Sequence, residues 1–258
     1  MTKVYTIGID VGGTNTDAAL LCDSEAVALV KVPTNHQDLL SSTMQALHNV
    51  LEHYDGKNPV QLHLSTTLST NAIVEGRGGP VKVVVVPGPG VNLESLKFPF
   101  PIIELSGYID HRGRQVSPLK VDQIAGLKEK LGEDDEGALA IVGKFSQRNP
   151  SHEQQLKAEL SKRHKGFISL GHRLSGRANF PRRIVTTYLN ASIARHQLDF
   201  LDVWKKIDRD RIGEVSILKA DGGTMTLEDS AHRPIESILS GPAASIMGVN
   251  ALTSCQKK

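Results

Sequence analysis

Eight residues, Asp10–Asp17 (Asp-Val-Gly-Gly-Thr-Asn-Thr-Asp), are of the types that bind phosphate. Glycines let a backbone approach a ligand closely and adopt positive φ angles, and successive N–H groups of such a turn can surround an anion. Threonine hydroxyls add donors, and Asp10 can hold a water bound to Mg²⁺. A plain hairpin turn explains the same residues through glycine geometry and polar solubility, so the segment alone favours neither interpretation.

This segment matches neither common glycine-loop fingerprint. It lacks the lysine of the G-x-x-x-x-G-K-[ST] loop, and a hairpin is expected after it instead of the helix of a dinucleotide fold. The ten histidines are scattered, no Cys/His/Asp group has metal-ligand spacing, and no G-x-S-x-G elbow indicates a serine nucleophile. The acidic run Glu133–Glu136 is better explained as a solvated loop than as a metal site.

Three other short segments have a functional and a structural interpretation. Asp221–Thr226 repeats Asp-Gly-Gly-Thr after an expected strand, but Asp-Gly is also a favoured hairpin pair. Ser240–Ser245 begins a helix whose free N–H groups and dipole suit an anion, although small residues also permit close helix packing. Ser65–Ala72 lies at a strand-to-helix junction, where capping by a hydroxyl is a sufficient explanation. A ligand role for its threonines or Asn71 is the less favoured interpretation.

The elements that must position these segments can be predicted from apolar periodicity. Short strands at 4–9, 18–21 and 26–32, joined by tight turns, predict an antiparallel meander. A helix follows, with one apolar face formed by Leu40, Met44, Leu47, Leu51 and Tyr54. The nearly all-β-branched segment 81–86 is typical of a strand buried on both faces.

The rest of the chain alternates between strands and helices. Further strands are expected at 60–64, 138–142, 167–170 and 215–218, a hairpin turn at 110–114, and helices at 70–75, 121–131, from 149, at 181–207 and at 240–251. A meander followed by alternating elements predicts a mixed α/β sheet with helices against its faces. A boundary between residues 166 and 180 separates this first unit from a helix-rich stretch.

Composition excludes several classes of protein. The 258 residues suffice for one large domain or two small ones, and 39% hydrophobic with 22% charged residues fits a globular protein. Only 4% are aromatic, so the core must be aliphatic. A net charge of +2 gives no field for a polyanion, and Cys22 and Cys255 are too few for a disulfide scaffold. Without a signal peptide or an apolar run of about 20 residues, we expect a cytoplasmic protein with neither nucleic-acid nor membrane partners.

Five segments resemble, in order, motifs of the hydantoinase A/oxoprolinase family: Gly8–Asp17, Thr66–Glu75, Asn149–Glu153, Thr186–Ala191 and Ser240–Ala244. This family belongs to the actin, sugar-kinase and heat-shock-chaperone ATPase superfamily. The resemblance implies an α/β, ribonuclease-H-like (actin-like ATPase) fold with a mixed sheet and ATP between two lobes. The first lobe, with the phosphate loop, would be complete over residues 1–170, and residues 171–258 would be the helix-rich start of a partial second lobe.

The resemblance also implies an activity. Members of the family open cyclic amides of the hydantoin or 5-oxoproline type with ATP and Mg²⁺, by phosphorylation of the carbonyl oxygen, and the A-type subunit commonly works with a B-type subunit. Two alternatives remain open: a small-molecule kinase of the same fold, and a non-catalytic nucleotide-binding or assembly module. A kinase needs a carboxylate base that faces the γ-phosphate, and none can be assigned from this sequence.

Carried over by position, the resemblance assigns roles to single residues. Asp10 would be the catalytic residue and would hold Mg²⁺ through water. The phosphates would be bound by Gly12, Gly13, Thr14, Asn15 and Thr16. The cleft would be lined by Thr67, Asn71, Asp221, Gly222, Gly223, Ser240 and Gly241.

The sequence departs from the family pattern in two ways. Asn15 stands where phenylalanine is common, and the family's second Asp-x-Gly-Gly-Thr loop, which follows the Ser-Gly-Pro-Ala helix, is missing before Lys258. Asp221–Thr224 precedes that helix and is not an obvious substitute. We therefore expect a fragment of a longer protein, with a partner chain or a lost activity as alternatives, and weak or no nucleotide binding by residues 1–258 alone.

Overall fold

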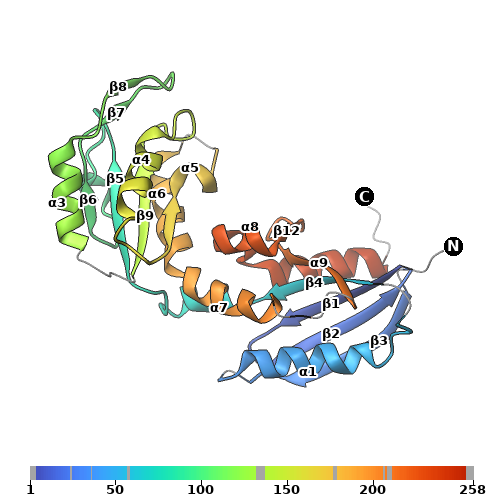
Figure 1. Ribbon diagram of the computed structural model, residues 1–258. Coiled ribbons are helices and arrows are strands. Elements are labelled where there is room, and N and C mark those ends of the chain that lie inside the picture. The colour runs from blue at the N-terminus through green and yellow to red at the C-terminus, as the bar shows by residue number, and fades with distance from the viewer. Residues whose placement is uncertain are drawn as a thin grey trace. The chain divides into compact units, whose positions relative to one another are not determined.

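The computed structural model describes residues 4–23, 25–35, 37–56, 59–131, 137–176, 179–205, 207 and 211–253, in two compact units (Figure 1). Unit 1 comprises Met1–Arg77 and His196–Lys258, and unit 2 comprises Gly78–Arg195. The units divide at 77/78 and at 195/196, and neither point coincides with the expected boundary at 170/171. The chain leaves unit 1 after Arg77 and returns at His196 to complete the sheet of unit 1. The lobe assignment itself stays a prediction. Glu133–Glu136 and Cys255 lie outside the described residues.

Unit 1 contains a six-stranded mixed sheet in the order β12-β11-β4-β1-β2-β3. The antiparallel meander is confirmed, since β2 pairs antiparallel with both β1 and β3, whereas β4 is parallel to β1 and to β11. The strands are β1 (Tyr5–Val11), β2 (Asn15–Cys22), β3 (Glu25–Pro33), β4 (Val60–Thr66), β11 (Ile212–Leu218) and β12 (Thr224–Thr226).

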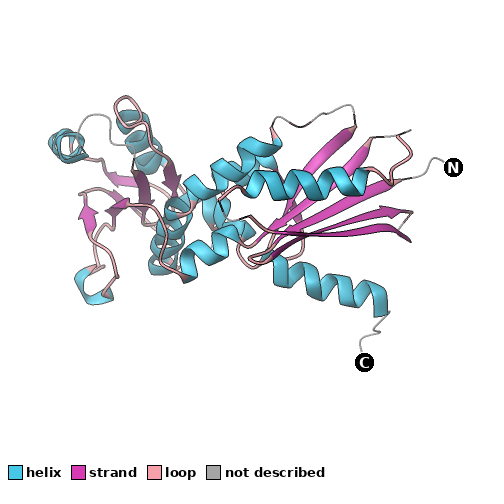
Figure 2. Ribbon diagram, turned by 90° about the horizontal axis from the view of Figure 1, so that it is seen from below, coloured by secondary structure: helices cyan, strands magenta, loops and turns pink. Residues whose placement is uncertain are grey.

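Helices lie on both faces of this sheet, and Figure 2 shows α1 and α9 on opposite sides of the strands. The helices of unit 1 are α1 (Leu39–Leu51), α2 (Leu68–Val74), α7 (Ala194–Trp204), α8 (Leu227–His232), the 3₁₀ turn η2 (Pro234–Ser237) and α9 (Ser240–Thr253). The predicted face of α1 is partly wrong: Leu40 is 45% exposed, whereas Thr43 and Val50 are buried. Thr43 tolerates burial because its hydroxyl donates to the Leu39 carbonyl at 2.6 Å.

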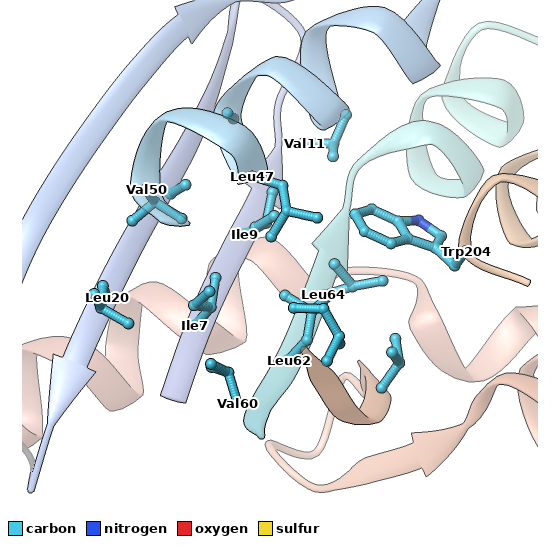
Figure 3. Packing of buried hydrophobic residues seen from close by; sticks show 14 of the residues in the cluster. Ile7, Ile9, Val11, Leu20, Leu47, Val50, Val60, Leu62, Leu64 and Trp204 are labelled. Atoms are coloured by element: carbon cyan, nitrogen blue, oxygen red, sulfur yellow. The ribbon is translucent and has the colours of Figure 1, made fainter. Parts of the chain in front are cut away.

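The core of unit 1 lies between the sheet and α1. Ile7, Ile9 and Val11 of β1 point into it with Leu62 and Leu64 of β4 (Figure 3). Side chains alternate along a strand, so the even-numbered residues of β1, including Asp10, face the α9 side. This core is mainly aliphatic, as the composition predicts, with Trp204 of α7 as its largest buried side chain.

The single helix expected over 181–207 is wrong. Two helices are present, α6 (Phe180–Ser192) and α7, and Ile193 interrupts them with φ −100° and ψ −2°. No glycine or proline stands at the break, and fully buried Ile193 carries no sequence signal for it. The break nearly coincides with the return of the chain to unit 1 at His196.

Unit 2 is built on a parallel sheet in the order β10-β9-β5-β6. The predicted burial of segment 81–86 on both faces is confirmed for strand β5. Val83 and Val85 belong to one cluster of buried apolar side chains, and Val84 and Val86 belong to a second cluster. Its elements are β5 (Val81–Val86), η1 (Glu94–Leu96), β6 (Ile102–Glu104), β7 (Tyr108–Ile109), β8 (Gln115–Ser117), α3 (Val121–Leu131), β9 (Ala138–Gly143), α4 (Ser151–Leu160), β10 (Ile168–Leu170), α5 (Gly171–Leu174) and α6. No helix among the described residues is long and apolar enough to cross a membrane.

The side chain of Glu153 joins four elements of unit 2. It is fully buried, and its Oε1 accepts the Gly143 N–H at 2.8 Å. Its Oε2 accepts the His172 backbone N–H at 2.9 Å and lies 2.5 Å from His172 Nδ1. Buried Arg183 of α6 donates to the Gly143 carbonyl at 3.0 Å and is attracted to the same carboxylate. The family-like segment Asn149–Glu153 therefore has a structural role in unit 2.

We predict that Glu153→Ala lowers the free energy of unfolding of unit 2 by about 3–5 kcal/mol, because one partner of a buried charged network is removed. Urea denaturation followed by circular dichroism measures this loss. The matched control is Glu159→Ala in the same helix, whose carboxylate pairs with Lys128 and Lys162 and is 33% exposed. The control should be much milder, and equal losses for the two variants would contradict the assigned role.

Candidate functional site

Asp10 is the penultimate residue of β1 and lies in register between Asp17 of β2 and Ser65 of β4. Its Oδ1 atom is buried and has no hydrogen-bond partner among the described residues. Buried carboxylate oxygens in proteins are normally hydrogen-bonded. The unpaired oxygen is therefore suited to a donor from a ligand or from a hydrated cation.

The first turn of α9 lies against Asp10. A Cβ added to Gly241 would be 3.7 Å from Asp10 Oδ1, 3.6 Å from Thr67 Cγ2 and 3.8 Å from Ser65 Oγ. Ser240 is fully buried, with its hydroxyl 3.2 Å from that of Ser65. The fold thus brings together four of the residues predicted from sequence: Asp10, Thr67, Ser240 and Gly241.

The predicted phosphate loop forms the tight turn between β1 and β2. Gly12 N–H donates to the Asn15 carbonyl at 3.0 Å, and the Thr14 carbonyl accepts from Thr34 N–H at 2.9 Å. Gly13 and Thr14 are exposed, and their own N–H groups donate to no acceptor within the described ranges. The segment is therefore a hairpin turn that leaves two adjacent donors free for an anion.

Thr16 differs from the rest of the turn. It is fully buried, and its hydroxyl lies 3.0 Å from the hydroxyl of Thr34. This contact joins β2 to the residue that follows β3, so the Thr16 side chain shapes the turn from behind. Its direct contact with a phosphate stays a prediction.

Thr67 and Asn71 lie where β4 passes into α2. Both the N–H and the hydroxyl of Thr67 donate to the Val11 carbonyl, at 3.1 and 3.2 Å. Thr67 therefore does not cap α2 with its side chain, and Thr66 Oγ1 accepts the Leu68 N–H at 3.2 Å instead. Asn71 Nδ2 reaches Thr67 Oγ1 only at 3.5 Å and lies 3.8 Å from a Cβ added to Gly13.

Asp221, Gly222 and Gly223 form the hairpin turn between β11 and β12. Gly222 N–H donates to the Lys219 carbonyl at 3.1 Å, and Gly223 N–H donates to Asp221 Oδ1 at 2.9 Å. This N–H and the Lys219 ammonium, 3.1 Å from Oδ2, hold the pKa of Asp221 below its usual range. The hairpin interpretation is confirmed, and a ligand role for these residues stays a prediction.

Two pockets lie near the glycine turn. The Asp10 pocket, of about 550 Å³, is on the α9 face and includes Gly8, Asp10, Asp17, Lys31, His63 and Ser65. The turn pocket, of about 760 Å³, lies beside the turn itself and includes Gly13, Thr14, Thr67, Asn71, Phe200 and Trp204. Both are lined entirely by residues of unit 1.

Sequence reasoning missed His63 and Trp204. His63 Nδ1 and Trp204 Nε1 are buried and have no hydrogen-bond partner in the part of the chain that the structure describes. The register places His63 beside Gly8, but only the β1–β4 pairing reveals it. The described residues contain no group of three His, Cys, Asp or Glu side chains that could hold a metal by themselves.

The family models for the hydantoinase/oxoprolinase N-terminal region and for hydantoinase/oxoprolinase match residues 6–164 and 183–258. Caprolactamase subunit alpha of Pseudomonas jessenii is 25% identical, over 93% of this chain and 39% of that subunit. 5-Oxoprolinase 1 of Arabidopsis thaliana is 25% identical, over 93% of this chain and 23% of that protein. The chain therefore spans less than half the length of either relative.

Solved structures share the fold. Nucleotide-free acetone carboxylase matches 98% of this chain and 41% of its own, with a TM-score of 0.81 and 18% identity. The ATP-dependent caprolactamase from Pseudomonas jessenii matches 98% of this chain and 41% of its own, with a TM-score of 0.74 and 22% identity. The expected mixed α/β fold of the actin-like ATPase type is confirmed. Two family models match the chain in sequence order, and the first alone covers more than half of the chain. The chain therefore belongs to the hydantoinase/oxoprolinase family.

Proposed function

We propose that this chain is the nucleotide-binding part of an ATP-dependent enzyme that opens a cyclic amide of the hydantoin or 5-oxoproline type. The observation that carries the proposal is that strand β1 carries an unbonded, buried Asp10 oxygen and that the turn directly after this strand leaves the Gly13 and Thr14 N–H groups free. Two family relatives, a caprolactamase described as ATP-dependent and a 5-oxoprolinase, support the reaction class.

The residues fit Mg²⁺-ATP. The free N–H groups of Gly13 and Thr14 would bind phosphate oxygens, which are the strongest acceptors such a turn can meet. Asp10 would hold Mg²⁺ through water, since a lone carboxylate with phosphate oxygens is a common magnesium environment. When bound, ATP would supply the phosphoryl group that activates the amide carbonyl by phosphorylation of its oxygen.

The side chains around Asp10 would keep its carboxylate in place. The first turn of α9 covers it at Gly241, and the hydroxyls of Ser65 and Ser240 contact each other beneath that turn. The hydrogen bond from the Thr67 hydroxyl to the Val11 carbonyl joins the end of β4 to the end of β1. It would therefore hold the glycine turn and the start of α2 at a fixed distance from each other. A carboxylate that is already in position would interact with the hydrated Mg²⁺ without a rearrangement of the protein during the reaction.

The active enzyme would contain more polypeptide than this chain. The relatives are longer, and the caprolactamase chain is named as a subunit. We propose that further residues of the full protein complete the phosphate site from the other lobe and that a B-type subunit joins the assembly.

We predict that Asp10→Asn lowers amide-dependent ATP hydrolysis by the complete enzyme at least about 100-fold, because a preorganised charge in the site is lost. A coupled assay of ADP release, with Mg²⁺ varied, measures the effect. The control is Asp202→Asn, which removes an exposed carboxylate that pairs with Lys205 at 2.7 Å and lines neither pocket. Full activity of Asp10→Asn would refute the proposal, and equal losses in both variants would deny Asp10 a specific role.

We predict that Gly12→Ala weakens Mg²⁺-ATP binding by the complete enzyme about 5- to 150-fold, because overpacking of the turn that binds the phosphates typically costs about 1–3 kcal/mol. A Cβ there would lie 2.9 Å from the backbone oxygen of Asn15, so the turn must shift. Gly126→Ala in α3 of unit 2 is the control, since its Cβ would meet nothing within 4 Å and it lines neither pocket. Calorimetric titration with Mg²⁺-ATP compares the two, and unchanged affinity in Gly12→Ala would show that the turn does not bind the nucleotide.

A further inference from the structure

The hairpin of β7 and β8 lies at one end of unit 2 and carries the turn Asp110–Arg114 (Figure 1). Asp110 is 4% exposed, and its Oδ1 accepts the backbone N–H groups of Arg112 and Arg114, each at 2.9 Å. Its Oδ2 accepts from Arg114 Nε at 2.8 Å. The Arg114 backbone N–H is the largest cause that lowers the pKa of Asp110 to about 2. A carboxylate that stays charged therefore fixes the turn.

Two contacts attach this hairpin to the rest of unit 2. Asn149 Nδ2 donates to the Gly113 carbonyl at 2.8 Å, and Gly113 adopts the positive φ of 86° that the turn requires. The Tyr108 ring lies so close to Gly88 that a Cβ there would be 2.7 Å from it. The hairpin is therefore held both at its turn and at its base.

Three arginines surround the fixed turn. Arg112 and Arg114 flank Gly113 in the chain, and a Cβ added to Gly113 would be 3.4 Å from the Cβ of Arg148. All three arginines are exposed. Arg112 and Arg148 pair with no carboxylate in the described part of the chain, and the side chain of Arg114, which bonds Asp110 through Nε, is 72% exposed. We call Arg112, Arg114 and Arg148 the arginine tip.

The chemistry of the arginine tip is recognition of anionic oxygens. The guanidinium fork binds a carboxylate or a phosphate through two parallel hydrogen bonds. Two observations favour carboxylates of a protein over a nucleic acid. The whole chain has a net charge of only +2, and Val116 of β8, two residues beyond Arg114, is 57% exposed. Exposed arginines beside an apolar side chain are typical of protein–protein interfaces.

We propose that the arginine tip and Val116 are the docking surface for an acidic segment of the partner subunit of the complete enzyme. The inference rests on the proposed function, which gives that enzyme a B-type subunit. Aspartate or glutamate side chains of the partner pair with the guanidiniums, and an apolar side chain covers Val116. Because Asp110 orders the turn beforehand, docking immobilises few groups of this chain.

Charge reversal in the arginine tip tests the proposal. In Arg112→Glu and Arg148→Glu, repulsion replaces attraction, so the Kd between the complete A-type protein and its B-type subunit should rise at least about 10-fold, or about 1.4 kcal/mol. Sedimentation velocity measures this Kd. The matched control is Arg182→Glu, at an exposed arginine in the first turn of α6, which should leave the Kd unchanged. An unchanged Kd in both tip variants, or an equal loss in the control, overturns the proposal.

A third variant separates the fixed geometry from simple charge. Asp110→Ala removes a negative charge next to the arginines, so an attraction that depended on net charge alone would become stronger. The proposal expects the opposite, a Kd about 2- to 10-fold higher, because the turn loses the bonds that order it. Circular dichroism verifies that the variant is folded, and tighter docking of folded Asp110→Ala contradicts the role of the fixed turn.

A cross-link tests the contact directly. Val116→Cys, labelled with a benzophenone maleimide in the complete enzyme, should on irradiation attach to an acidic peptide of the B-type subunit. The unsubstituted chain, labelled in the same way, reports the background from Cys22 and Cys255. Attachment only to other parts of the same polypeptide overturns the proposal. Binding of a single-stranded RNA oligonucleotide that Arg112→Glu abolishes, with docking of the subunit unaffected, also overturns it.

The test of the arginine tip is independent of the test of Asp10. The tip lines neither pocket of unit 1, so Arg112→Glu should bind Mg²⁺-ATP as tightly as the unsubstituted protein in a calorimetric titration. Docking that requires the tip, without any Asp10-dependent hydrolysis, would refute the proposed function alone. Asp10-dependent hydrolysis with docking that ignores the tip would refute this inference alone.

Discussion

The parallel pairing of β1 with β4 is the interaction on which the site depends. Its register sets Asp10 beside Ser65 and Val11 beside Thr66, so both strands end at one edge of the sheet. Beyond that edge, one chain segment turns back into β2 and the other enters α2. The two bonds from Thr67 to the Val11 carbonyl join these ends. A shift of one residue would send Asp10 into the aliphatic core and Ile9 to the other face.

Unmet hydrogen-bonding groups in unit 1 gather next to its two pockets. Asp10 Oδ1 and His63 Nδ1 belong to residues on the α9 face, and Trp204 Nε1 to the opposite side. Each buried unpaired group costs about 1–3 kcal/mol. The tightly packed aliphatic core offsets this cost, because Ile7, Leu62 and Leu64 are completely buried. The residues that carry these groups are among those that line the two cavities.

Much of the fold could be predicted from sequence because its signals are local. The meander follows from short strands and tight turns, and β5 from a run of β-branched residues. The interruption at Ile193 left no such signal, and neither did the return of the chain to unit 1, since both depend on contacts between distant segments. The buried face of α1 was misjudged because Ser42 and Thr43 satisfy their hydroxyls within the helix.

The same distinction applies to the site. The glycine turn is contiguous, so its residue types alone made phosphate binding one of two interpretations, beside a plain hairpin turn. His63 and Trp204 come from elements that reach the turn only through the tertiary fold, and neither has a motif of its own. Thr16 matches the motif by type, and only the tertiary fold shows that it is buried against Thr34 and shapes the turn from behind.

The discontinuity of unit 1 has a consequence for biosynthesis. Strand β11 pairs with β4, with Val60 opposite Ile212, and all of unit 2 lies between them in the sequence. A ribosome therefore releases β1 to β4 and then the whole of unit 2 before the partner of β4 exists. Until then the apolar β4 has an unpaired edge, which is prone to wrong association. Unit 2 can fold during this interval, and the His196 ring, 3.0 Å from the Arg77 carbonyl, then joins the two ends of the inserted segment.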